Sequence, residues 1–182
     1  ASSLEQPNEN FAREILQLFS IGTEKLNLDG TTQNDGQGKP LPTYDQSVVD
    51  EFKRVYTGWY IPEIPCPPPN SGDTCGEWVA PMSFDPDYHD TDTKTLFAGF
   101  LPNPTVLPQD QTGSQDLNGA IDAIFQHPNV GPYVARELIH SLVTSNPSPA
   151  YVERVANAFN DNGSSVRGSL WAVVKAILLD PE

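Results

Sequence analysis

The last third of the chain constrains the fold most, because its apolar side chains recur with the period of an α-helix. A first helical face combines Leu117, Ala120, Ile121, Ile124 and Phe125. Three more such faces follow, over residues 134–142, 152–159 and 170–178. Proline at position 128 favours an end to the first helix, and Ser148-Pro149 suits the start of the third. The pattern predicts four helices in succession.

Two further amphipathic segments lie near the amino-terminal end. Over residues 8–21, a buried stripe is predicted from Phe11, Ile15, Leu18 and Phe19, with Ala12 and Leu16 widening it. A second apolar face combines Val48, Val49, Phe52, Val55 and Tyr56. With six predicted helices, the fold class is mainly α, as an irregular multi-helix domain.

Residues 61–113 show no sustained helical period and are rich in proline and glycine. Short apolar pieces such as Trp78-Val79 and 96–101 allow at most short strands. A stretch of this length without structure is unusual in a compact domain. We therefore predict a single helical domain over residues 1–182, with residues 61–113 as one irregular loop insertion that packs on the helices or lines a site.

The only two cysteines, Cys66 and Cys75, lie within this proline-rich stretch. A disulfide between them would stabilise the fold by about 2–3 kcal/mol through the closure of a short loop. The alternative, a zinc-binding pair, lacks further cysteine or histidine ligands at a suitable spacing. A disulfide implies the periplasm or the cell exterior.

The charge balance limits the classes of partner. Ten basic and 24 acidic side chains give a formal net charge of −14, without a lysine or arginine cluster. Such a charge repels nucleic acid and anionic lipid headgroups. No apolar run reaches the roughly 18–20 residues that a membrane span needs. The sequence thus predicts no nucleic-acid binding and no membrane span.

Two segments carry candidate catalytic residues. The first predicted helix contains Glu9, Arg13 and Glu14, with Glu14 placed at the edge of the apolar stripe. A polar loop, residues 84–94, contains His89, Asp90 and Lys94, and histidine beside a carboxylate suits acid–base chemistry. The alternatives are a solvated Glu9–Arg13 ion pair and ordinary turn-forming residues.

Two sets of residues could hold a divalent cation, the only cofactor that the sequence suggests. One set is Glu14, His89 and Asp90. The other is Asn27, Asp29 and Asp35, in an oxygen-rich loop that lacks the spacing of an EF-hand.

Several motifs, in order along nearly the whole chain, resemble the bacterial family of domains of unknown function 1800. They include residues 8–14, 18–22 and 26–30, Thr57-Gly58-Trp59, Phe84-Asp85, His89-Asp90 and 94–96, and then 127–130, 135–138 and 143–149. The resemblance implies an exported, mostly helical protein, often encoded beside another exported family. It also implies that this chain corresponds to the C-terminal part of a longer domain. The motif positions that it marks are Asn8, Glu9, Arg13, Glu14, Trp59, His89, Asp90 and Lys94.

Two functions follow from these observations. The first is a binding or structural module of the cell envelope, whose partner is an envelope protein or the amino-terminal part of the same domain. The second is a metal-assisted hydrolase or oxidoreductase, in which Glu9, Glu14 and His89 converge. The second predicts that the His89 loop folds against the amino-terminal half of the first helix, and the first predicts that the two lie apart in solvent.

Overall fold

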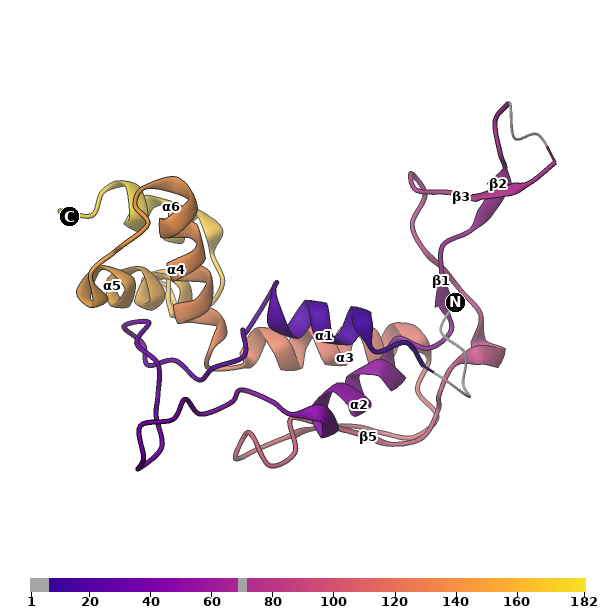
Figure 1. The fold of residues 1–182 in the computed structure, drawn as a ribbon, viewed down its shortest axis with the longest axis horizontal. Coiled ribbons are helices and arrows are strands. Elements are labelled where there is room, and N and C mark those ends of the chain that lie inside the picture. Colours follow the sequence, from indigo (N-terminus) through magenta and orange to yellow (C-terminus); the bar gives the residue numbers. More distant parts are fainter. Residues whose placement is uncertain (1–6, 69–71) are drawn as a thin grey trace. The chain divides into compact units, whose positions relative to one another are not determined.

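The computed structural model describes residues 7–68 and 72–182, and this part of the chain contains six α-helices and only short strands (Figure 1). The mainly α prediction is confirmed. The chain divides into two compact units: unit 1 combines residues 1–13 and 46–122, and unit 2 combines residues 14–45 and 123–182. The assignment of all 182 residues to a single domain stays a prediction.

The helices lie where the apolar periods predicted them. Their bounds are α1 (Asn10–Gln17), α2 (Gln46–Val55), α3 (Gly113–Gln126), α4 (Val130–Leu142), α5 (Pro149–Asn160) and α6 (Leu170–Leu178). Serine caps begin the last two, because Ser148 Oγ accepts from Tyr151 N at 3.2 Å and Ser169 Oγ accepts from Ala172 N at 3.4 Å. These contacts satisfy backbone donors that a helix start leaves without partners.

Between residues 59 and 107, the described residues form three antiparallel strand pairs and a short 3₁₀ helix, η1 (Pro86–Tyr88), and all of these except β1 lie within the predicted loop insertion. The pairs are β1 (Trp59–Tyr60) with β4 (Ser83–Phe84), β2 (Glu63–Pro65) with β3 (Thr74–Gly76), and β5 (Lys94–Leu96) with β6 (Thr105–Leu107). The strand expected at Trp78-Val79 does not form, and both side chains are exposed. Of the apolar piece 96–101, only Leu96 belongs to a strand.

A disulfide joins Cys66 and Cys75, as predicted, with the two Cα atoms 5.0 Å apart. The zinc alternative for this pair is therefore wrong. The bond lies at the β2–β3 hairpin, where Ile64 pairs with Cys75 and Cys66 N donates to Asp73 O at 3.0 Å. It links the two strands of a short hairpin that has little apolar burial of its own, since all three residues of β2 are exposed.

Unit 1 has its core between α2 and the β5–β6 pair. Val48, Val49, Phe52 and Val55 of α2 are buried, as the sequence predicted, and Leu96 and Phe97 are buried with them. The rings of Phe52 and Phe97 meet edge to face, with centroids 5.1 Å apart. This packing fixes β5 beside α2.

Unit 2 is built from α4, α5 and α6, together with the loop that follows α1. Helix α5 packs on both α4 and α6. Asn129, which is buried just before α4, accepts from Leu26 N at 2.8 Å and donates to Ile21 O and Glu24 O at 2.7 and 2.8 Å. This one side chain therefore fastens the loop to the start of α4.

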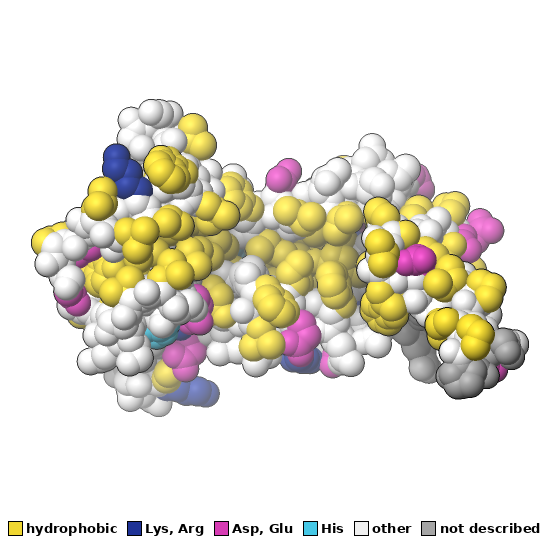
Figure 2. Space-filling model, turned by 90° about the horizontal axis from the view of Figure 1, so that it is seen from above, with side chains coloured by type: hydrophobic (Ala, Val, Ile, Leu, Met, Phe, Trp, Pro, Cys, Tyr) yellow, Lys and Arg dark blue, Asp and Glu magenta, His cyan; other side chains and the backbone are white. Residues whose placement is uncertain are grey.

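The stripe predicted for α1 is confirmed only in part. Ala12 and Leu16 are fully buried and Ile15 is half-buried, whereas Phe11, Leu18 and Phe19 are exposed. Glu14, placed by the sequence at the edge of this stripe, is exposed as well. Two apolar rows overlap on this short helix, one through Phe11 and Ile15 and one through Ala12 and Leu16. The sequence alone does not determine which row packs against another part of the fold. Exposed apolar side chains also occur on α6, at Leu170, Trp171 and Leu178, and Figure 2 shows how widely hydrophobic side chains are spread over one face.

Candidate functional site

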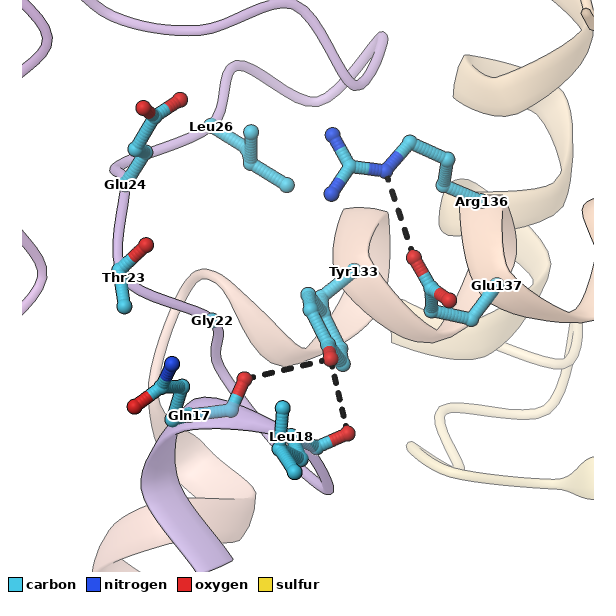
Figure 3. Close-up of a pocket in the computed structure, with 9 residues that line it drawn as sticks. All are labelled: Gln17, Leu18, Gly22, Thr23, Glu24, Leu26, Tyr133, Arg136 and Glu137. Atoms are coloured by element: carbon cyan, nitrogen blue, oxygen red, sulfur yellow. Dashed lines mark hydrogen bonds and ion pairs between the residues drawn. The ribbon is translucent and has the colours of Figure 1, made fainter. Parts of the chain in front are cut away.

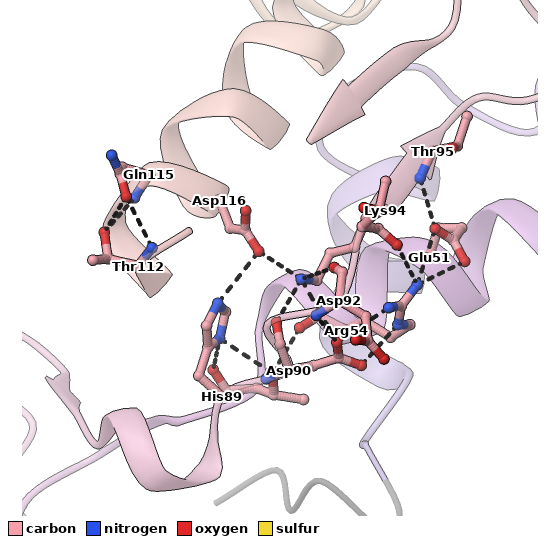
Figure 4. A network of polar contacts seen from close by, with 12 residues as sticks. Glu51, Arg54, His89, Asp90, Asp92, Lys94, Thr95, Thr112, Gln115 and Asp116 are labelled. Carbon is pink, nitrogen blue, oxygen red and sulfur yellow. Dashed lines mark hydrogen bonds and ion pairs between the residues drawn. The ribbon is translucent and has the colours of Figure 1, made fainter. Parts of the chain in front are cut away.

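Six ionisable side chains of unit 1 form a connected set, which we call the buried ionic cluster: Glu51, Arg54, His89, Asp90, Lys94 and Asp116 (Figure 4). Three separate elements supply them. Helix α2 carries Glu51 and Arg54, the segment from the end of η1 to β5 carries the next three, and the first turn of α3 carries Asp116. The α2–β5 packing described above brings the first two elements together.

At the centre of the cluster, Asp116 lies between a lysine and a histidine. Its Oδ2 atom is 2.7 Å from Lys94 Nζ and 3.3 Å from His89 Nε2. The exposed fractions are 0% for Asp116, 1% for Lys94 and 5% for His89. Neither carboxylate oxygen of Asp116 has a hydrogen-bond partner within residues 7–68 and 72–182, so Lys94 holds this carboxylate as an ion pair. A buried carboxylate of this kind depends on its cation for stability.

Lys94 also donates to two backbone carbonyls, Asp90 O at 2.5 Å and Asp92 O at 3.0 Å. All the partners of its ammonium group are thus fixed parts of the fold. A helix start favours an anion, so the place of Asp116 in the first turn of α3 adds to its stabilisation.

The orientation of His89 determines where its protons lie. Its Nδ1 atom is 3.0 Å from the carbonyl oxygen of Thr57, which can only accept, so Nδ1 carries a hydrogen and donates it. The other ring nitrogen, Nε2, lies 3.3 Å from Asp116 Oδ2 and forms no hydrogen bond within the described residues.

The outer part of the cluster is a bidentate ion pair between Arg54 and Asp90. Arg54 donates from Nε and Nη2 to the two carboxylate oxygens of Asp90, at 2.8 and 3.1 Å. These bonds raise the pKa of Arg54. For Asp90, desolvation works in the opposite direction, but the hydrogen bonds from Arg54 and from Asp92 N outweigh it and lower the pKa. Glu51 extends this network, because its carboxylate accepts hydrogen bonds from Arg54 Nη1 and from Thr95 N.

Thr57 joins the two parts of the cluster. Its hydroxyl accepts from Asp90 N at 2.8 Å and donates to Arg54 O at 2.7 Å, and its carbonyl accepts from His89. Gly58, which follows, has a φ of +81°, and a Cβ at this position would lie 2.6 Å from Asp85 O. Only glycine allows η1 and His89 to approach the end of α2 so closely.

The predicted catalytic residues separate into two groups. His89, Asp90 and Lys94 meet in the cluster. Glu9 and Arg13 instead form an ion pair of 2.9 Å that Gln46 bridges, with Gln46 Nε2 donating to Glu9 Oε2 at 2.7 Å and Arg13 Nη2 donating to Gln46 Oε1 at 2.8 Å. The bond from Arg13 lowers the pKa of Glu9. Glu14 is exposed and belongs to unit 2.

The two predicted cation sets stay predictions. Among the residues that the structure describes, no group of three or more His, Cys, Asp or Glu side chains is placed to hold a metal ion. In the oxygen-rich loop, Asp29 Oδ1 accepts from Thr31, Asp35 Oδ1 accepts from Gln37 N and Lys39 N, and Asn27 Nδ2 donates to Thr31. These side chains form turns in their own loops.

Sequence reasoning missed Asp116, Arg54 and Glu51. Asp116 offered one signal, a lone acidic residue in the first turn of a predicted helix. Its complete burial could not be read from the sequence, because the elements that cover it lie at positions 57–94.

A surface pocket of about 280 Å³ lies in unit 2, between the end of α1 with its following turn and helix α4 (Figure 3). Gln17, Leu18, Gly22 and Leu26 form one side, and Tyr133, Arg136 and Glu137 of α4 form the other. The sequence did not reveal it either, because its two sides are more than 100 residues apart.

None of the described helices is both long enough and apolar enough to cross a membrane. No curated protein and no solved structure matches the chain. The family model described as "Protein of unknown function (DUF1800)" matches residues 1–182, the full length of the chain. The chain therefore belongs to the DUF1800 family.

Proposed function

We propose that this chain is an exported binding module of the cell envelope, and that its buried ionic cluster stabilises the fold instead of performing catalysis. The burial of His89, Lys94 and Asp116 carries this proposal, because a catalytic group has to come within hydrogen-bonding reach of its substrate. Five per cent or less of each of these residues is exposed, and each already has partners within the fold.

The surface of the chain offers the means of binding. The pocket in unit 2 is lined by Leu18, Leu26 and the ring of Tyr133, together with three charged side chains, Glu24, Arg136 and Glu137. Apolar surface beside a few convergent polar groups suits ligand binding. The disulfide supports export, since disulfides persist in oxidising compartments and this one holds an exposed hairpin.

Histidine modification tests the proposed role of the cluster. Diethyl pyrocarbonate acylates accessible imidazoles, and the chain has three histidines: His89 and His127 are buried, whereas His140 is exposed. We expect the native protein to be modified at His140 alone, and the urea-unfolded protein at all three positions, as measured by peptide mass spectrometry. Modification of His89 at the rate of His140 would show that the cluster is open to reagents, and the proposal would fail.

Thiol trapping tests the proposed location. Cells of the native host are denatured in the presence of a maleimide, which labels free thiols. We expect Cys66 and Cys75 to stay unlabelled, and reduction before labelling should give two maleimide additions per chain. Labelling of both thiols without reductant would place the protein in a reducing compartment and contradict export.

A further inference from the structure

Contacts within the fold hold the sides of the pocket in unit 2 in place. The hydroxyl of Tyr133 donates to Leu18 O at 2.8 Å and also lies 3.3 Å from Gln17 O, so it holds the last carbonyls of α1. Beside its ring the chain turns at Gly22, where φ is +67° and a Cβ would come within 2.9 Å of the ring. Asn129 fastens the same loop further on. Both sides of the pocket are therefore held in place before binding, which lowers the entropic cost of binding.

Three charged side chains line this pocket: Glu24, Arg136 and Glu137. The carboxylate of Glu24 accepts a hydrogen bond from Thr32 Oγ1 at 3.1 Å, and the opposite charges of Arg136 and Glu137 stand side by side. Arg136 Nε lies 3.7 Å from Glu137 Oε1, which is a loose ion pair. The two Nη atoms of Arg136 point across the pocket towards Leu26 (Figure 3), and they make no hydrogen bond or ion pair to any residue that the structure describes. These two nitrogens leave the guanidinium group able to bind the carboxylate of a ligand in a bidentate manner.

The neighbouring charges decide which ligands fit. A simple anion would gain from Arg136 but would meet the carboxylate of Glu137 and the net charge of −14. A simple cation would meet the guanidinium group. A small zwitterion, with its carboxylate and ammonium groups on adjacent atoms, satisfies both side chains together.

The size and the apolar lining narrow the choice further. At about 280 Å³ the pocket falls just below the range of roughly 300–1,000 Å³ for drug-sized ligands. Leu18 and Leu26 line its apolar part. We propose that it binds a free α-amino acid with an aliphatic side chain, with the carboxylate on Arg136, the ammonium group on Glu137 and the side chain against the two leucines. This inference rests on the proposed binding function and names its ligand.

A titration of ¹⁵N-labelled protein with L-leucine, followed by NMR, tests the inference. We expect saturable shifts at Leu26, Tyr133 and Arg136. N-acetyl-leucine lacks the ammonium group and isoamylamine lacks the carboxylate, so each should bind at least tenfold more weakly. Equal binding of all three compounds would contradict recognition of a zwitterion, and the absence of saturable shifts would overturn the inference.

A pair of arginine variants supplies the control. Arg136→Gln should weaken leucine binding at least tenfold, because it removes the carboxylate partner. Arg154→Gln removes another arginine of unit 2, one that pairs with Asp180 outside the pocket, and should leave leucine binding unchanged. Circular dichroism verifies that both variants fold. Undiminished binding by folded Arg136→Gln would overturn the inference, while histidine modification and thiol trapping decide the proposed function separately.

Discussion

Replacing Lys94 with methionine is the most direct test of the reasoning about the buried ionic cluster. Methionine has a similar length and keeps the apolar stem, but it lacks the ammonium group. The change removes the ion pair to Asp116 at 2.7 Å and two hydrogen bonds to backbone carbonyls. Asp116 would then remain fully buried with only His89 beside its carboxylate.

The expected loss of stability is large. Removing one partner of a buried ion pair costs about 3–5 kcal/mol, because the other charge stays buried without compensation. For a chain of this size, a loss of 1 kcal/mol lowers the melting temperature by roughly 2–4 °C. Lys94→Met should therefore lower the melting temperature of the protein by roughly 6–20 °C.

Urea unfolding, followed by circular dichroism and by hydrogen exchange in unit 1, measures this loss. Lys53→Met is the matched control. Lys53 also forms an ion pair of 2.7 Å, with Asp50, but both side chains are partly exposed, and the expected cost is below about 1 kcal/mol. A double variant, Lys94→Met with Asp116→Leu, removes both charges and should be less destabilised than the sum of the two single variants.

Equal losses for Lys94→Met and Lys53→Met would refute the reasoning, since burial would then make no difference to the ion pair. Strict additivity in the double variant would refute it as well, because the two charges would not interact.

Three further predictions concern other parts of the chain. Burial, with smaller effects of Lys25 and Arg167, lowers the pKa of His127 to about 4, so the folded state favours the neutral ring. This preference contributes about 3 kcal/mol to the free energy of unfolding above pH 6.5, and the contribution is lost as the pH falls towards 4. We therefore expect acid titration of unfolding to show a slope in this window that His127→Gln reduces, and an unchanged slope would contradict this account. Replacing Cys66 and Cys75 with serine should cost about 2–3 kcal/mol and speed amide exchange in β2 and β3, and unchanged exchange in both strands would contradict a stabilising role of the disulfide. Long-range ¹H–¹⁵N NMR should find a hydrogen on Nδ1 of His89, and a ring protonated only at Nε2 would contradict the hydrogen bond to Thr57.

The helical part of the fold could be predicted from the sequence because helices are local. The apolar period in residues 117–178, the cap at Ser148 and the buried face of α2 were all predicted, and all appear in the structure. The stripe of α1 was misjudged in part, for a reason that is not local. A period identifies an apolar face, but the neighbour that covers one stripe and leaves Phe11 and Leu18 exposed is set by tertiary packing.

The candidate site was predictable only in part. The sequence singled out His89, Asp90 and Lys94 because reactive residue types cluster there within a few positions. It could not associate them with Asp116 or Arg54, which come from helices about 20 residues downstream and 35 residues upstream. The burial of His89 and Lys94 then supports a structural role inside the fold, in place of the catalytic role that their residue types predicted.

By itself, the sequence determined the mainly helical class, the disulfide between its only two cysteines, the acidic charge and the family, because each of these depends on residue identity and on spacing along the chain. Only the tertiary structure decided which charges meet and which are buried. Coulomb energies depend on distance in space and on the surrounding dielectric, and neither quantity is encoded in any local stretch of residues.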